Sequence, residues 1–259
     1  MDLEPVFTFV PLSNKTYNGI HDKNIQQLLM KWGMKDNINI QNFAFNESFH
    51  SYHKYHLVEA FFKDEAVAKA LKLKNGNKWI PEEITASSVE VKQLQCSVLS
   101  MAFFDKLRNS DNNIVHKSGA IRKRCDEEIE DFLVADNLRV MLLNESSDEY
   151  GLYTQNEREE FIFVIFQMLV LGGILCQYED NIQHYLDTTK TIYKDLISVE
   201  IQEETHELHV TTMVMKVEVK NSRGESYFPR NPSHKQNLGF LLIEPSSRQI
   251  TTVLHQFSC

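Results

Sequence analysis

The sequence feature that most constrains the fold is a nearly unbroken apolar run from Phe161 to Cys176, in which Gln167 is the one clear polar residue. A segment that is apolar on every side forms either a buried helix or a membrane span, and a span needs about 20 consecutive apolar residues. This run is shorter, acidic residues stand on both sides of it, and no lysine lies near either end to orient it in a bilayer. We therefore predict a helix that is buried in a protein core.

A second, amphipathic helix is predicted directly after the buried one, starting near Asp180. We expect the two helices, over residues 156–197, to form a hairpin with the first inside and the second shielding it. Asn156 and Glu159 have the spacing of a capping box for the first helix. The Gly172–Gly173 pair marks either a close approach to a neighbouring element or the last helical turn. Apolar residues at helical spacing define the buried face of the second helix: Ile182, Tyr185, Leu186, Ile192, Tyr193 and Leu196.

Three stretches of the sequence carry a resemblance to a known family. Residues 158–199 contain R-E-E-F-I-F, L-G-G-I-L-C-Q-Y-E-D and Y-L-D-T-T-K-T-I-Y-K-D-L-I-S-V. Residues 48–64 contain S-F-H-S-Y-H-K and A-F-F-K-D, and residues 131–143 read D-F-L-V-A-D-N-L-R-V-M-L-L. Together they resemble the cilia- and flagella-associated protein 300 family, over most of the chain.

The resemblance implies a cellular role and not a reaction. Members of this family are understood as non-enzymatic proteins of the cytoplasm and the motile cilium, needed for assembly or transport of outer and inner dynein arms. The resemblance therefore also implies that the protein is needed for axoneme organisation and for ciliary motility. The implied partners are other dynein-arm assembly factors, dynein arm subunits or the ciliary transport machinery. The resemblance supplies no assigned catalytic residues, so no site carries over to this sequence.

Composition narrows the class of protein. The 259 residues are enough to bury a substantial core, and 16 phenylalanines supply much of it. A net charge of −9 argues against a nucleic-acid binder, which would normally show a basic face. The acidic N-terminus lacks the pattern of a signal peptide, so we expect an intracellular location and no membrane partner. The cysteines are too far apart for a zinc pair or a C-x-x-C motif, and the last is misplaced for prenylation: Cys96, Cys125, Cys176 and Cys259.

We predict an α+β fold in a single globular unit, 1–259. The central helical hairpin packs with a C-terminal antiparallel sheet, 198–259, and with an N-terminal mixed α/β part, 1–144. Four successive strands without intervening helices imply the antiparallel sheet: Val199–Ile201, Leu208–Val219, Leu238–Ile243 and Ile250–Phe257, with Gln202–Glu207 as a hairpin loop.

The N-terminal part has a mixed pattern. Leu57–Phe62 fits either a buried strand or the start of a helix, because a short apolar run does not separate the two. The other predicted elements are strands at Val6–Val10, Asn37–Phe45 and Val89–Val98, and helices at Asp22–Trp32, Ala66–Leu73, Met101–Leu107 and Phe132–Leu143.

Three polar groupings are candidates for chemistry, and each has a plainer explanation. The H-x-x-H-x-x-H run from His50 to His56 suggests a metal, but its first and third histidines diverge on a helix, and no further ligand is spaced to complete a site. The pair Glu179–Asp180 fits acid–base or Mg²⁺ chemistry, or a helix cap. The basic run Lys117–Arg124 fits phosphate or an acidic partner surface, or else an exposed loop neutralised by Asp126–Asp131.

We assign no catalytic, cofactor-binding or metal-binding residue, and we expect the chain to act through protein contacts. Interfaces use aromatic and arginine anchors on exposed patches. The alternatives are a stable structural component of the axoneme, and a small-molecule-binding protein or enzyme with a site scattered in the sequence. A deep pocket lined by convergent polar groups would favour the last. The residues we nominate for partner binding come from the stretch 48–62 and the loop 227–234: Tyr52, Tyr55, Phe62, Tyr227 and Phe228.

Overall fold

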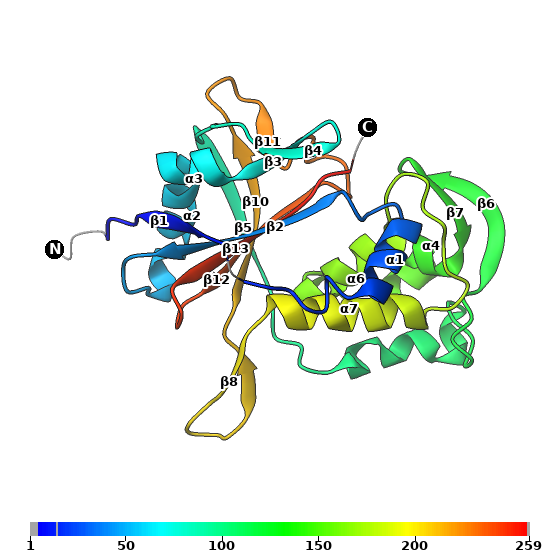
Figure 1. Ribbon diagram of the computed structural model, residues 1–259. Helices are drawn as coiled ribbons and strands as arrows, with labels where there is room; N and C mark the ends of the chain where they lie inside the picture. Colours follow the sequence, from blue (N-terminus) through cyan, green and yellow to red (C-terminus); the bar gives the residue numbers. More distant parts are fainter. Residues whose placement is uncertain (1–4, 14, 258–259) are drawn as a thin grey trace.

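A seven-stranded antiparallel sheet forms the middle layer of the molecule (Figure 1). The computed structural model describes residues 5–13 and 15–257. The strand order is β1-β2-β13-β12-β10-β5, and β11 pairs with β10 beyond the end of β12. Strands from the two ends of the chain therefore lie side by side, at β2 and β13. The sheet strands are β1 (Phe9–Leu12), β2 (Ile38–Phe45), β5 (Ser88–Leu94), β10 (Met213–Lys220), β11 (Ser226–Phe228), β12 (Leu238–Glu244) and β13 (Gln249–His255).

Helices cover both faces of the sheet, which confirms the predicted α+β class. Leu241 and Ile243 of β12 pack toward α2 and α3, whereas Phe240 and Leu242 pack toward α6 and α7. Because successive residues of a strand point to opposite faces, burial on both sides explains why β12 is apolar at nearly every position. The helices are α1 (Lys23–Lys31), α2 (Lys54–Lys63), α3 (Glu65–Ala70), α4 (Asn137–Leu143), α5 (Gln155–Arg158), α6 (Phe161–Leu171) and α7 (Gln183–Leu196).

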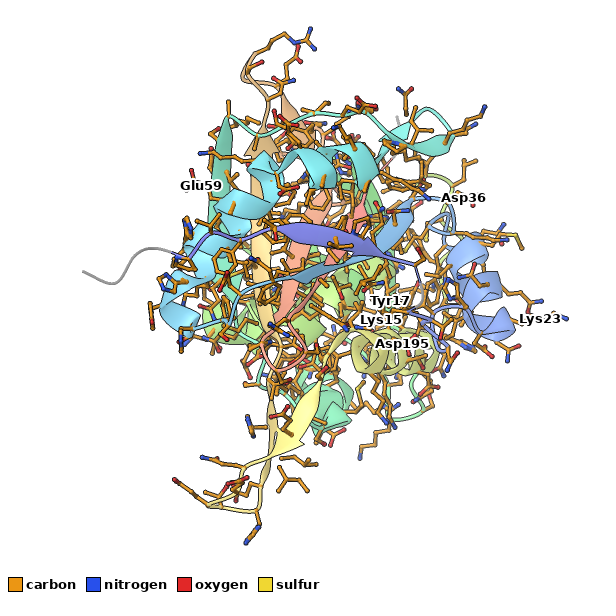
Figure 2. The ribbon with its side chains drawn as sticks, turned by 60° about the vertical axis from the view of Figure 1, so that its left-hand side comes forward. Lys15, Tyr17, Lys23, Asp36, Glu59 and Asp195 are labelled. Atoms are coloured by element: carbon orange, nitrogen blue, oxygen red, sulfur yellow. The ribbon has the colours of Figure 1, made fainter. Side chains whose placement is uncertain are left out.

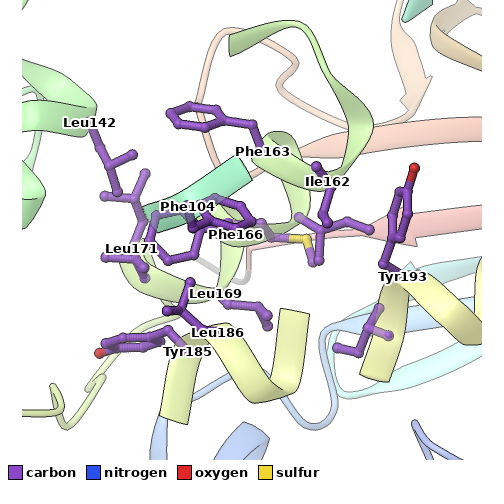
Figure 3. Packing of buried hydrophobic residues seen from close by; sticks show 14 of the residues in the cluster. Phe104, Leu142, Ile162, Phe163, Phe166, Leu169, Leu171, Tyr185, Leu186 and Tyr193 are labelled. Atoms are coloured by element: carbon purple, nitrogen blue, oxygen red, sulfur yellow. The ribbon is translucent and has the colours of Figure 1, made fainter. Parts of the chain in front are cut away.

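The predicted buried helix is α6, and it forms the centre of the core on its side of the sheet (Figure 3). Its Phe166 ring lies 4.8 Å from the ring of Phe104, and its Phe163 ring lies 4.7 Å from that of Tyr153. Helix α7 packs along α6 and presents its own apolar stripe, so the predicted hairpin is confirmed. None of the described helices is long and apolar enough to cross a bilayer.

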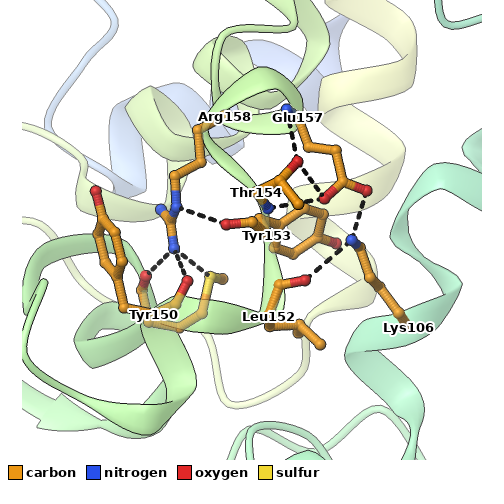
Figure 4. A network of polar contacts seen from close by, with 8 residues as sticks. Lys106, Tyr150, Leu152, Tyr153, Thr154, Glu157 and Arg158 are labelled. Carbon is orange, nitrogen blue, oxygen red and sulfur yellow. Dashed lines mark hydrogen bonds and ion pairs between the residues drawn. The ribbon is translucent and has the colours of Figure 1, made fainter.

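The chain enters α6 through the short helix α5, which is capped by its own polar network (Figure 4). Thr154 is the N-cap. Its hydroxyl accepts the Glu157 N–H at 3.3 Å, and the Glu157 carboxylate accepts the Thr154 N–H at 2.8 Å. Lys106 donates to the other carboxylate oxygen of Glu157 at 2.6 Å. The capping box predicted at Asn156 is therefore wrong by two residues, since Thr154 and Glu157 have the same spacing.

Several predicted boundaries are wrong where a polar side chain ends an element. Only the second half of 132–143 is helical, because Asp136 accepts the Arg139 N–H at 2.9 Å and caps α4. The segment before it is strand β7. The long strand predicted at 208–219 is broken at Thr211 and Thr212. The remaining strands are β3 (Lys72–Asn75), β4 (Lys78–Pro81), β6 (Lys123–Ile129), β7 (Phe132–Asp136), β8 (Val199–Ile201) and β9 (Leu208–Val210), and the 3-10 helices are η1 (Ser51–His53), η2 (Met101–Arg108), η3 (Ser110–Asn112) and η4 (Asp148–Leu152).

The N-terminal predictions have a mixed outcome. The helix at Asp22–Trp32 and the strand at Asn37–Phe45 are confirmed as α1 and β2. Leu57–Phe62 is helical, within α2. The helix predicted at Ala66–Leu73 ends at Ala70, and strand β3 follows. The first strand lies three residues later than predicted and includes Pro11, which an edge strand such as β1 tolerates.

The glycine pair after α6 makes a close backbone contact, as one of the two sequence interpretations predicts. The Gly173 N–H donates to the Trp32 carbonyl at 2.8 Å, and the Gln177 N–H donates to the Lys31 carbonyl at 3.0 Å. A Cβ atom built on Gly173 would lie 2.1 Å from the Gly33 carbonyl oxygen. The end of α1 thus docks directly on the loop that follows α6.

A buried histidine closes the end of β13. His255 is inaccessible to solvent, and its Nδ1 donates to the Gln236 carbonyl. The Gln236 side chain in turn donates to the Met168 carbonyl at 2.9 Å, which ties this corner to α6. Burial lowers the pKa of His255 to about 4; the hydrogen bond to the Gln236 carbonyl opposes this shift, and the nearby Lys74 and His234 contribute to it. The imidazole is therefore neutral in the folded protein.

This histidine predicts a loss of stability in mild acid. The unfolded chain takes up the proton near pH 6.5 and the folded chain only near pH 4, so the stabilisation is complete above pH 6.5 and falls as the pH drops toward 4. By pH 5 we expect this group to lower the free energy of unfolding by about 2 kcal/mol. Urea unfolding at pH 7 and pH 5 measures it, and His255→Asn should show a pH dependence smaller by that amount. Equal pH dependence in the two proteins would contradict a buried neutral imidazole.

Candidate interaction surfaces

Two of the nominated tyrosines lie in an exposed aromatic cluster where η1 leads into α2. We call it the tyrosine–histidine cluster: His50, Tyr52, His53, Tyr55 and His56. Tyr52 is 72% exposed and Tyr55 is 51% exposed. The ring of Tyr52 stacks on that of His50 with centroids 5.3 Å apart and an interplanar angle of 5°, and it contacts His53 at 4.3 Å. Because the rings restrain one another, a partner would immobilise little additional side-chain freedom.

The cluster is anchored to neighbouring elements. Lys54 lies 5.4 Å from the centroid of the Tyr55 ring and donates to Gln93 of β5 at 2.7 Å. The Nε2 of His56 lies 3.0 Å from the Pro5 carbonyl oxygen. Among residues 5–13 and 15–257, no group of three histidine, cysteine or acidic side chains is placed to hold a metal ion. These contacts favour the surface-cluster explanation of the three histidines.

The other three nominated residues are buried, so they present no surface to a partner. Phe62 and Phe228 pack on each other at 5.2 Å between ring centroids, in the core between α2 and the sheet. Tyr227 lies in the same core, and burial raises the pKa of its hydroxyl. The aromatic stretch 48–62 thus divides between surface and core, because Phe61 and Phe62 of α2 face inward, whereas Tyr55 of α2 and Tyr52 of η1 face outward.

This division predicts opposite results for two sets of substitutions. The double substitution Tyr52→Ala and Tyr55→Ala should change the free energy of unfolding by less than about 1 kcal/mol, since both side chains are exposed. Phe62→Ala should lower it by about 3–5 kcal/mol, because it opens a cavity in the core. Urea unfolding measures both. A large loss in the tyrosine double variant would mean that the cluster stabilises the fold and is not a free surface.

A buried arginine joins two of the three stretches that carry the family resemblance, 131–143 and 158–199. Arg139 of α4 is inaccessible to solvent and forms an ion pair with Asp136. Its guanidinium donates to the Val170 carbonyl of α6 at 2.8 Å and to the Tyr185 hydroxyl of α7 at 2.9 Å. The ring of Tyr178 lies 3.4 Å from the guanidinium carbon. One side chain thus connects α4, α6, α7 and the loop between the last two.

The acidic pair at 179–180 takes part in this scaffold and is not a helix cap. Glu179 is buried, pairs with Lys31 at 2.8 Å, and accepts the Trp32 indole N–H at 3.0 Å. Asp180 is exposed and pairs with Lys123 at 2.7 Å. The helix that should use the cap begins only at Gln183. The two carboxylates therefore point to different neighbours, and they fix the loop after α6 to α1 and to β6.

The same loop exposes two apolar residues. Leu175 is 90% exposed and has a backbone φ of +61°, a conformation that is unfavourable for a leucine. Ile174 beside it is also exposed, while Gly173 and Cys176 on either side are tied to the body of the protein. Backbone strain of this kind persists where the surrounding contacts over-determine it, often at functional sites. Ile174 and Leu175 therefore form a second candidate contact point.

The buried thiols show no sign of activation. Burial raises the pKa of Cys96 to about 11 and that of Cys176 to about 12. The thiolate is the nucleophilic form, so both groups are weak nucleophiles at neutral pH. This pattern is typical of structural cysteines.

A cavity of about 640 Å³ lies between residues 11–13 and 15–21, the sheet and helices α6 and α7. Lys15, Tyr17 and Asp195 meet beside it (Figure 2). The Tyr17 hydroxyl donates to the Asn42 amide oxygen at 2.5 Å, and the Thr251 hydroxyl donates to the same oxygen at 2.9 Å. The Tyr17 hydroxyl and the Asn42 amide oxygen on its wall are thus bonded to each other. Apolar residues outnumber polar ones on the wall, which also carries charged and amide side chains such as Lys15, Gln26 and Lys35. The cavity therefore has a mixed lining.

A further exposed apolar surface, besides the Ile174–Leu175 loop, also lies outside the nominated residues. The strands β8 and β9 form a two-stranded ribbon whose Val199, Ile201 and Leu208 are between 45% and 63% exposed. The sequence carries a signal for this ribbon. The tripeptides V-E-I at 199–201 and L-H-V at 208–210 each have apolar residues on either side of a polar one, and they stand on either side of the predicted hairpin loop. The assumption of one continuous strand from Leu208 to Val219 concealed that signal, since it treated Leu208 as part of a long sheet strand and not of a separate ribbon.

Comparisons with known proteins agree on one family. A family model described as cilia- and flagella-associated protein 300 matches residues 6–255. A protein of that name from Paramecium tetraurelia is 29% identical over 239 residues, which cover 92% of this chain and 89% of the relative. Another from Chlamydomonas reinhardtii is 28% identical over 253 residues, which cover 96% of this chain and 97% of the relative. No solved structure matches the chain.

Proposed function

Because the chain belongs to the cilia- and flagella-associated protein 300 family, we propose that it is a non-enzymatic factor in the assembly or transport of the outer and inner dynein arms of motile cilia. It acts through contacts with other proteins: assembly factors, dynein arm subunits or the ciliary transport machinery. It works in the cytoplasm and reaches the axoneme. The family match over nearly the whole chain is the observation that carries this proposal.

The surface of the molecule supports action by contact. The tyrosine–histidine cluster and the exposed Ile174–Leu175 loop are both held in place by buried polar or ring contacts. Interface anchors are often aromatic side chains whose conformation is already restrained before binding. The thiols of Cys96 and Cys176 are protonated at neutral pH, and the Tyr17 hydroxyl and the Asn42 amide oxygen in the cavity of about 640 Å³ are bonded to each other. These features favour a binding protein over an enzyme.

A structural component of the axoneme is the main alternative, and extraction separates the two. Motile ciliated cells are divided into cytoplasm and axonemes, and the axonemes are washed with high salt. An assembly factor should be found mainly in the cytoplasmic pool, and the axonemal remainder should be released by salt. A chain that stays on the doublet microtubules after the wash, with little in the cytoplasm, would be a structural component.

Small-molecule binding is a second candidate function, and the cavity beside Tyr17 is the observation that favours it. Native mass spectrometry of the protein purified from ciliated cells should detect any bound compound as added mass. Added mass that disappears on denaturation would support ligand binding. The bare mass of the chain would support a role through protein contacts alone.

A further inference from the structure

The ribbon of β8 and β9 with its loop 202–207, which we call the β8–β9 arm, projects away from the body of the protein (Figure 1). Val199 lies opposite Val210 and Ile201 opposite Leu208, so these four side chains share one face, and Glu200 and His209 share the other. An isolated two-stranded ribbon is marginally stable in water unless a further strand or a packed face supports it. The arm thus has one apolar face that is open to an additional element.

The free backbone groups of the arm belong to the same four residues. The Gln202 N–H donates to the Glu207 carbonyl at 2.9 Å, and the Thr211 N–H donates to the Ser198 carbonyl at 3.0 Å. In an antiparallel pair, residues with inward and outward backbone groups alternate. The N–H and C=O groups of Leu208 and Val210 therefore point outward, along the free edge of β9.

The base of the arm is fixed, so this edge has a defined direction. The hydroxyls of Thr211 and Thr212 each donate to the Glu244 carboxylate at 3.0 Å, and the Ser198 N–H donates to the Thr212 hydroxyl at 2.8 Å. These contacts attach β8 to the end of β12. The free edge of β9 accordingly lies on the opposite side, in line with the edge of β10 that pairs with β5.

Strand β5 leaves this edge before it reaches the arm. Its last pair is Leu94 with Val214, after which the Gln95 N–H donates to the Glu159 carbonyl at 3.2 Å and the chain turns toward α6. A groove of about 450 Å³ remains between 93–97 and 210–214. An extended segment that pairs with β9 would enter this groove. It would occupy the position beside residues 210–213 that β5 no longer fills after Leu94.

The charge of the arm specifies the partner. The arm carries Glu200, Glu203, Glu204 and Glu207, and no lysine or arginine occurs between Asp195 and Met215. Resting on the function proposed above, we propose that the free edge of β9 and the groove at its base bind an extended, basic segment of a partner protein as an added strand. Alternate apolar side chains of that segment pack on the apolar face, and its lysines or arginines meet the acidic loop.

A synthetic peptide of about ten alternating lysines and valines is the probe, with binding followed by fluorescence polarisation. The full chain should bind it, and Ile201→Asp with Leu208→Asp should weaken binding by at least about tenfold. A peptide with glutamate in place of lysine and one with methylated backbone nitrogens should both bind at least about tenfold more weakly. His209→Ala, on the opposite face, is the matched control and should bind normally. Equal binding by all proteins or all peptides would overturn the proposal.

Two further measurements complete the test. Light scattering reports the oligomeric state: a dimer that the Leu208→Asp substitution dissociates would mean that a second copy occupies the edge, which also overturns the proposal. In motile ciliated cells that lack this chain, electron microscopy of axonemes shows whether each form restores the dynein arms. Failure of the normal chain would contradict the proposed function. If the normal chain and the double variant restore the dynein arms equally well, the proposed function stands and the proposed binding site on the β8–β9 arm is overturned.

Discussion

Replacement of Arg139 by methionine is expected to lower the free energy of unfolding by about 3–5 kcal/mol, because it breaks an ion pair that is fully buried. Methionine has a similar length but no charge. The Asp136 carboxylate would remain buried without its partner, and the Val170 carbonyl and the Tyr185 hydroxyl would lose a donor. The loss therefore comes mainly from a buried charge left uncompensated, and less from the packing of the side chain.

Urea unfolding followed by circular dichroism measures this loss, and two controls identify its cause. Lys123→Met breaks the exposed pair with Asp180 and should lower the free energy of unfolding by less than about 1 kcal/mol. Asp136→Leu combined with Arg139→Met removes both charges and should recover a substantial part of the loss. A double variant as unstable as the sum of the two single variants would contradict the ion-pair explanation.

The second large effect concerns the backbone contact at Gly33. We expect Gly33→Ala to lower the free energy of unfolding by about 2–5 kcal/mol. Its φ is +67°, which costs an alanine about 1–2 kcal/mol, and its Cβ would lie 2.3 Å from the Ile174 carbonyl oxygen, where relief of the clash adds about 1–3 kcal/mol. The substitution should also displace the exposed Ile174–Leu175 loop.

Gly76→Ala is the matched control for this prediction. Gly76 has a similar φ of +55°, but a Cβ atom there would meet open space. Thermal or urea unfolding should therefore show only the conformational loss of about 1–2 kcal/mol. The difference between the two variants isolates the close contact between α1 and the loop after α6. Equal losses would contradict that contact.

The sequence contains enough information for the central helices and for the antiparallel character of the later strands. An apolar run such as 161–171 is too short to cross a bilayer as a helix, so it is expected to be buried in a protein core. The strands at 238–243 and 250–257 are separated only by a short polar turn. The participation of β2 and β5 in the same sheet was not predictable, because strand pairing between distant segments leaves no local periodicity.

Single polar side chains account for most of the misplaced boundaries. Asp136 ends β7 by capping α4, and Thr211 and Thr212 interrupt a β-pattern because Glu244 binds their hydroxyls. The Asp136 carboxylate changes the local backbone hydrogen bonding. The Glu244 carboxylate that binds the two threonines lies on another strand, β12. Propensity and periodicity therefore point to a longer helix or strand than the one that forms.

The nominated partner-binding residues show the same limit. Aromatic residues supply both core and interface, so composition alone does not separate Tyr52 and Tyr55 from Phe62, Tyr227 and Phe228. The helical phase of α2 decides between inside and outside for Tyr55 and Phe62, whereas Tyr52 lies on η1 and Tyr227 and Phe228 lie on strand β11. The burial of Arg139 was not predictable either, because charged side chains are rarely fully buried and three of its four contacts, to Val170, Tyr178 and Tyr185, come from distant parts of the chain.

The fold is thus a scaffold with several candidate contact points on its surface. Arg139, Glu179 and the Gly33–Gly173 contact hold the helices and the loop after α6 in place. The tyrosine–histidine cluster, the Ile174–Leu175 loop and the β8–β9 arm lie on its surface. The arm and the cluster are supported by different elements, so their contributions to partner binding should be separable by substitution.

The most direct test of the proposed assembly role is a pull-down of the tagged full chain from the cytoplasm of cells that are growing motile cilia, with the bound proteins identified by mass spectrometry. We predict dynein arm subunits or dynein-arm assembly factors in the eluate, and fewer of them with Tyr52→Ala and Tyr55→Ala or with Ile201→Asp and Leu208→Asp. Tubulin and doublet microtubule proteins in their place would contradict that role and support a structural component of the axoneme.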